Sequence, residues 1–151
     1  MSNRSASESG PEGTLFNLQT VHKMLPLVQR IVNDILLRQQ ILANLNPQQE
    51  RLQRQKRDLS WSQRKQRYAL QDEISDEEQS LQDAGEELEQ LGVVLLDPNA
   101  GRVGYPTMVN NRPAFFSWQP GEEGVHSWHF AEESVCHPIP SSWLKEISMA
   151  Q

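Results

Sequence analysis

The chain has only one cysteine among its 151 residues, and no apolar run approaches the roughly 20 residues that a membrane-spanning helix needs. A single cysteine cannot form an internal disulfide, which indicates a reducing compartment, so we predict a cytoplasmic protein. The opening "MSNRSASESGPEGT" lacks the apolar segment of a secretory signal. Its serine, glutamate, glycine and proline cannot bury a core, which predicts a disordered tail over residues 1–14.

Motifs of common enzyme classes are also missing. The sequence has no G-x-S-x-G motif and no glycine-rich phosphate loop. Hydrophobic residues make up only 36% of the chain, which is typical of an elongated helical protein with much exposed surface. The formal net charge of −6 gives no general attraction to nucleic acid. We therefore predict a protein that acts without a cofactor.

Two helical stripes follow the tail. The first has apolar residues at alternating steps of three and four, which is the spacing of a helix packed on a partner helix. It comprises Leu18, Val21, Leu25, Val28, Val32 and Ile35. Asn17 is a candidate N-cap, and Pro26 is expected to bend the helix without ending it. At Pro47 the sequence leaves open whether the helix breaks or only kinks.

The second stripe lies between two helix-end signals. Ser60, with Gln63 three residues later, is typical of a capping box, and Gly92 suits the position just after a helix. One member of the stripe, Glu77, is charged. The stripe comprises Leu70, Ile74, Glu77, Leu81, Ala84, Leu88 and Leu91. Two stripes joined by a short turn predict a long antiparallel helical hairpin over residues 15–91.

The composition then shifts to β-branched and aromatic residues separated by turn signals such as "DPNAG", "NN" and "QPGEEG". We expect strands near 93–96, 102–109, 114–118 and 125–130, with Pro106 marking an edge or a bulge. The predicted fold class is α+β, a helical hairpin packed with a small antiparallel β-meander. Residues 15–139 form one domain in this prediction, with the β unit over 93–139. Residues 140–151 form a tail that could hold a short helix after Ser142.

Three segments resemble one known family. "LFNLQTVHKMLPLV", "LGVVLLDPNAGRVGYP" and "FSWQPGEEGVHSWH" are similar to a bacterial family known as domain of unknown function 2203, over roughly residues 15–139. Gly104 and Tyr105 stand where that family tends to have Asp-Phe, and Ser117 replaces a cysteine. The C-terminal end of the similar region, "ESVCHPIP", is shorter than in the family pattern and lacks its arginine. The resemblance implies a helical hairpin with a small β unit in a bacterial cytoplasm, and it implies no activity.

The segment "GVHSWHFAEESVCH" gathers the nitrogen and sulfur atoms that zinc prefers. The ligand set would be His126, His129, Cys136 and His137. In a strand over 125–130, however, His126 and His129 point to opposite faces, because side chains alternate. The spacing also lacks the paired ligands of a structural zinc turn. We therefore predict no metal site, and an adjacent Cys136 and His137 make a poor catalytic pair.

A pocket is the alternative use of this region. A hairpin built on "PGEEG" would bring two tryptophans within reach of each other across the sheet. Its members would be Tyr105, Trp118, Glu122, Trp128 and His129. The competing interpretation is that the tryptophans pack on the helices and that His129 bonds a carbonyl or Glu122. The pocket would make the chain a metal-binding or small-molecule-binding protein, or an enzyme.

Charge is segregated along the hairpin. Seven of the fourteen Lys and Arg residues gather near its turn, and two aromatic residues, Trp61 and Tyr68, lie among them. The predicted basic tip comprises Arg51, Arg54, Lys56, Arg57, Trp61, Arg64, Lys65 and Arg67. Residues 72–89 carry nine acids and no base. A solvated surface is one interpretation; docking to an anionic partner is the other. The acidic flank disfavours nucleic acid, so we predict a homodimer or a protein partner and a non-catalytic interaction or structural module.

Overall fold

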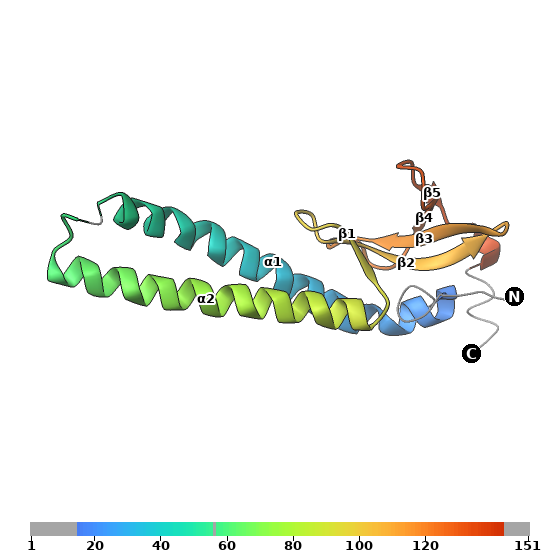
Figure 1. Cartoon of the computed structure of the whole chain (residues 1–151). Coiled ribbons are helices and arrows are strands. Elements are labelled where there is room, and N and C mark those ends of the chain that lie inside the picture. Colours follow the sequence, from blue (N-terminus) through green and yellow to red (C-terminus); the bar gives the residue numbers. More distant parts are fainter. Residues whose placement is uncertain (1–14, 56, 144–151) are drawn as a thin grey trace, which may run out of the picture.

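The computed structural model describes residues 15–55 and 57–143, which form two long helices followed by a five-stranded antiparallel sheet (Figure 1). The predicted α+β fold is therefore confirmed. The helices lie side by side as a hairpin, and its turn end projects away from the sheet (Figure 1). The predicted tail over residues 1–14 lies outside the described residues. Residues 141–143 are helical, and residues 144–151 of the predicted C-terminal tail also lie outside the described residues.

Helix α1 spans Leu18–Arg54 without interruption. The Asn17 side chain accepts a hydrogen bond from the Thr20 N–H at 2.8 Å, so the predicted N-cap is confirmed. Pro26 and Pro47 both lie inside the helix and both are exposed. Each proline removes one helical hydrogen bond, but on the exposed side water can bond the freed carbonyl. The helix is therefore continuous through Pro47, which the sequence alone could not decide.

Helix α2 spans Trp61–Gln90. Its capping box is present, because the Ser60 hydroxyl accepts from the Gln63 N–H at 3.2 Å while the Gln63 side chain accepts from the Ser60 N–H at 2.9 Å. At the other end, Gly92 has a φ of +85°. Its N–H donates to the Glu89 carbonyl, and the following N–H, of Val93, donates to Leu88. This pair of bonds ends the helix and turns the chain toward the sheet.

The charged member of the second stripe has a partner on the opposite helix. Both Glu77 carboxylate oxygens lie within 3.3 Å of Arg38 Nη1, and Arg38 Nε lies 3.2 Å from Asp34. In the sequence the pair lies between two apolar clusters of the hairpin, and Leu81 packs against both. One lies toward the turn and includes Leu42, Leu70 and their neighbours; the other joins the hairpin base to the sheet. Glu77 is therefore part of the helix contact even though it breaks the apolar pattern.

The sheet is a meander in the order β1-β2-β3-β4-β5. Its strands are β1 (Val94–Asp97), β2 (Arg102–Val109), β3 (Arg112–Trp118), β4 (Ser127–Phe130) and β5 (His137–Pro138). The predicted fourth strand began two residues too early, because Val125 leaves the ladder and packs into the core. The "NN" turn is a two-residue hairpin in which Asn110 and Asn111 have φ of 53° and 63°. The short β5 was not predicted.

Pro106 lies in an internal strand but at a local edge. It faces Phe115 of β3, while pairing with β1 stops at Gly104. The Pro106 carbonyl accepts a hydrogen bond from the Phe16 N–H at 2.8 Å. In a strand the N and O of one residue point the same way, so the missing N–H of proline also faces this side and costs no bond to β3.

One face of the sheet covers the base of the hairpin. Val103, Tyr105 and Trp118 are almost completely buried there, together with Val28 and Leu88 of the two helices. Residues that face each other across an antiparallel pair share a face, so Phe116 and Trp128 point the same way as Tyr105. The opposite face carries Gly104, Phe115 and His129. The candidate site residues are therefore divided between the two faces of the sheet.

Candidate functional site

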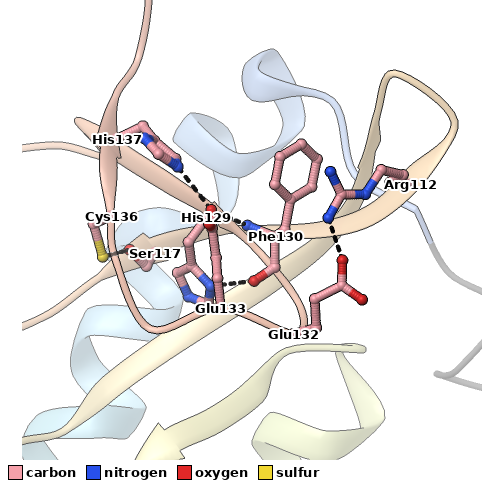
Figure 2. Close-up of polar contacts among 8 residues, drawn as sticks. All are labelled: Arg112, Ser117, His129, Phe130, Glu132, Glu133, Cys136 and His137. Carbon is pink, nitrogen blue, oxygen red and sulfur yellow. Dashed lines mark hydrogen bonds and ion pairs between the residues drawn. The ribbon is translucent and has the colours of Figure 1, made fainter.

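His129 is buried on the face of the sheet that points away from the helices. It is only 4% exposed, and its ring lies against Phe115 with centroids 5.6 Å apart. A carbonyl can only accept, so the Nδ1–H donates to the Phe130 carbonyl at 2.9 Å (Figure 2). Its Nε2 is buried and has no hydrogen-bond partner among the described residues. A carbonyl bond for His129 was one of the arrangements expected from the sequence.

The other members of the candidate ligand set have partners of their own or are exposed. His137 faces Trp128, with ring centroids 4.8 Å apart, and its Nε2 lies 2.7 Å from Glu133 Oε1 (Figure 2). Cys136 is exposed, with its Sγ 3.9 Å from Ser117 Oγ. His126 is exposed and precedes β4. Within residues 15–55 and 57–143, no three His, Cys, Asp or Glu side chains are placed to hold a metal ion.

Glu133 organises the loop between β4 and β5. Its Oε1 accepts the Phe130 N–H at 3.0 Å and also contacts His137. The backbone hydrogen bond, followed by the His137 contacts and the charge of Arg112, holds the Glu133 pKa below its ordinary value of 4.5. The carboxylate thus fixes the end of β4 against the start of β5. This role was not predicted from the sequence, because Glu133 lies in a loop with no recognised motif.

The five residues of the predicted aromatic pocket do not share one face. Tyr105, Trp118 and Trp128 lie on the helix-facing side, and His129 lies on the other. The Trp118 Nε1–H donates to the Glu122 carbonyl at 3.1 Å, and the Glu122 carboxylate accepts the Gln119 N–H at 2.9 Å. Glu122 therefore closes the β3–β4 turn around the indole. In this arrangement Trp118 acts as a core residue.

Tyr105 is the polar exception in this core. It is fully buried against Phe16, its hydroxyl has no hydrogen-bond partner among the described residues, and burial raises its pKa. A buried polar group without a partner costs about 1–3 kcal/mol.

We therefore expect Tyr105→Phe to raise the free energy of unfolding by about 1 kcal/mol, since the ring keeps its contacts and the unpaired hydroxyl is removed. Urea denaturation of both chains measures the change. Tyr68→Phe is the matched control, because Tyr68 is exposed and its hydroxyl is hydrated. A loss of stability in Tyr105→Phe would show that the hydroxyl is hydrogen-bonded, for instance to a buried water.

Two positions that depart from the resembled family lie on the same face as His129. Gly104 faces Ser117 across β2 and β3, and Ser117 faces Ser127, two residues from His129. A Cβ on Gly104 would lie 2.8 Å from side-chain atoms of both Leu96 and Phe115. Apolar side chains therefore fill the space that an aspartate would need here.

The basic tip lies at the turn end of the hairpin. Arg51, Arg54, Arg57, Arg64 and Lys65 are exposed, and Arg67 is half-buried. Lys56 lies outside the described residues. Trp61 and Tyr68 are 69% and 61% exposed, and Lys65 Nζ lies 5.8 Å from the Trp61 ring centroid. None of the described basic residues at the tip forms an ion pair within the part of the chain that the structure describes.

The surface around this tip is otherwise polar. A hollow of about 220 Å³ opens between the two helices just before the turn. Its lining consists of Gln48, Arg51, Leu52, Gln55, Gln63 and Gln66. Glutamine side chains and an arginine can bond backbone or carboxylate oxygens, whereas the exposed aromatic rings offer apolar area. The combination suits a protein surface that carries acidic groups.

A second hollow was not predicted from the sequence. It measures about 360 Å³ and lies between the start of α1 and the far end of the β2–β3 hairpin. Its lining includes Phe16, Asn17, Met108, Phe116 and Trp143. No sequence pattern joins these positions, because they meet only through the packing of the sheet on α1. It carries no ionisable side chain in its lining.

A family model described as "Uncharacterized conserved protein (DUF2203)" matches residues 14–137. No curated protein and no solved structure matches the chain. Neither described helix is long and apolar enough to cross a membrane. The family description names no activity.

Proposed function

The chain belongs to the DUF2203 family, and we propose that it acts as a non-catalytic protein-interaction module whose helical hairpin presents the basic tip to an acidic protein surface. The observation that carries the proposal is a group of exposed cations without internal ion pairs, set beside two exposed aromatic side chains. Aromatic residues and arginine are the side chains enriched at the centres of protein interfaces.

The shape of the hairpin supports this role. Its turn end projects away from the sheet, so a partner can approach the tip without meeting the β unit (Figure 1). The Arg38–Glu77 pair and the apolar cluster beyond it hold the two helices together along this projecting part. A rigid arm loses little conformational freedom when it binds, which favours affinity.

Protein is the favoured class of partner. Nucleic acid would approach a tip that is followed at once by nine acidic residues on the same helix, and these repel a phosphate backbone. We place this interaction in the cytoplasm, because Cys136 is an exposed and unpaired thiol, and such thiols persist where the compartment is reducing.

The test is site-specific photo-cross-linking in cells with the full chain. A photoreactive residue replaces Trp61 at the tip, and in a control chain it replaces Val135, which is similarly exposed on the β4–β5 loop. We expect protein adducts from position 61 only. These adducts are expected to disappear when Arg54, Arg57, Arg64 and Arg67 are changed to Gln.

Two results would contradict the proposal. Equal adducts from positions 61 and 135 would show that the tip has no preference. Adducts that survive the four substitutions would show that its charge is not used. The four-fold Gln variant is expected to keep its helical circular dichroism, because three of the four charges are exposed and contribute little to stability, and Gln at position 67 still favours a helix. That spectrum separates loss of binding from loss of folding.

A further inference from the structure

We propose that the partner of the basic tip is a second copy of this chain, paired antiparallel along the outward face of α2; this inference rests on the proposed function. The outward face is a stripe of exposed residues at steps of three and four, which is the spacing of a helix that packs on another helix. The α2 stripe comprises Trp61, Lys65, Tyr68, Asp72, Asp76, Gln79, Asp83 and Glu86, all of them exposed. It lies opposite the buried residues Leu70, Ile74, Ala84 and Leu88.

The α2 stripe changes sign near its middle. Its first part is basic and aromatic, with Arg64 beside it, and the part from Asp72 onward is acidic. Ala69, Leu70 and Gln71 form an uncharged boundary between the two parts. A surface with both signs on one helix is complementary to a copy of itself turned through 180°.

The position of the boundary fixes the register of the pair. A twofold axis at the level of residue 70 sets Lys65 of one copy near Asp76 of the other, each about 8 Å from the axis at 1.5 Å per residue. Tyr68 then lies beside Asp72 of the second copy. A parallel arrangement would instead set Lys65 against Lys65 and the acids against each other, which is repulsive. Charge therefore selects the antiparallel arrangement.

Most acidic residues that follow the basic part of α2 have no ion-pair partner within the described part of the chain. Of the nine acidic residues between 72 and 89, only Glu77 forms an ion pair within the described part of the chain. The others are exposed. Pairing two copies would bring each basic part against an unpaired acidic part and would do so twice, once on each side of the axis. One copy thus supplies both charges that the interface needs.

A charge-exchange experiment on the full chain tests the proposal. One variant, Arg64→Glu with Lys65→Glu, has an α2 stripe that is acidic throughout. The other, Asp72→Lys with Asp76→Lys, makes the middle of the stripe basic and matches it to the first part. We expect the wild type to be a dimer in sedimentation, and each variant alone to associate at least about tenfold more weakly, because like charges now face each other.

Mixing the two variants is expected to restore dimers, now only between unlike chains, because each acidic part then meets a basic one. The control variant Lys23→Glu with Arg30→Glu reverses two exposed charges on α1, outside the α2 stripe, and is expected to dimerise like the wild type. Wild-type association is also expected to weaken as salt rises to 1 M, where screening shortens to about 3 Å. This salt titration needs no variant to fold.

Several outcomes would overturn the pairing: a wild type that stays monomeric at high micromolar concentration, variants that dimerise alone, association that ignores salt, or a mixture that stays monomeric. A monomeric wild type whose position 61 still cross-links to a different protein, dependent on the four arginines, would defeat this inference and leave the proposed function standing. A monomer without tip-dependent adducts would defeat both.

Discussion

Replacing Trp118 with alanine is expected to lower the free energy of unfolding by about 3–5 kcal/mol. The indole is 1% exposed at the end of β3 and belongs to the cluster that joins the sheet to both helices. Truncation removes its packing and leaves a cavity that the rigid β3–β4 turn cannot fill. It also removes the donor to the Glu122 carbonyl. Most single substitutions cost far less, so this effect tests whether Trp118 is a core residue.

Urea denaturation at unchanged m-value measures this loss, at a chain concentration below any self-association. Trp61→Ala is the matched control, because it removes the same side chain from a 69% exposed position and is expected to change stability by less than about 0.5 kcal/mol. Trp118→Phe keeps a ring but loses the N–H, so its effect is expected to lie between the two. A small effect of Trp118→Ala would mean that the indole lines an adaptable pocket.

The helical hairpin could be predicted because its signals are local. The N-cap at Asn17, the capping box at Ser60 and the glycine at position 92 each act within one helical turn, so sequence spacing alone identifies them. The exception in the second stripe could not be interpreted in the same way. Glu77 and its partner Arg38 are separated by 39 residues in the chain, and only the packed register of the two helices brings them together.

In the candidate site, too, local patterns could be interpreted from the sequence, whereas contacts between distant residues could not. Alternation along a strand predicted that His126 and His129 would point to opposite faces, but His126 lies just before β4, where it is exposed, whereas His129 is buried within the strand. Strand register decided the rest. Placing Tyr105 with Trp128 and apart from His129 requires knowing which residues face each other across β2, β3 and β4. The sequence does not fix that pairing, because turn lengths and strand ends were uncertain by about two residues.

Gly101→Ala is expected to lower the free energy of unfolding by about 2–5 kcal/mol, since it adds backbone strain and overpacking at one position. Gly101 ends the β1–β2 turn with a φ of +75°, which favours glycine. A Cβ there would lie 2.9 Å from both Leu36 Cδ1 and Val32 Cγ1, so the turn is seated directly on α1. The melting temperature of this variant, compared with that of the wild type, measures how much the packing of this turn on α1 contributes to stability.

Gly85→Ala provides the opposite case in the same chain. Gly85 lies inside α2, and nothing lies within 4 Å of the position that an added methyl group would take, so alanine there is expected to add about 0.5–1 kcal/mol of stability. A double variant separates the two causes at Gly101. Leu36→Ala removes one of the two close side chains, so combined with Gly101→Ala it is expected to cost less than the sum of the single changes. If the effects of the two substitutions are strictly additive, crowding by Leu36 contributes nothing to the loss in Gly101→Ala, and the loss is assigned to the backbone conformation.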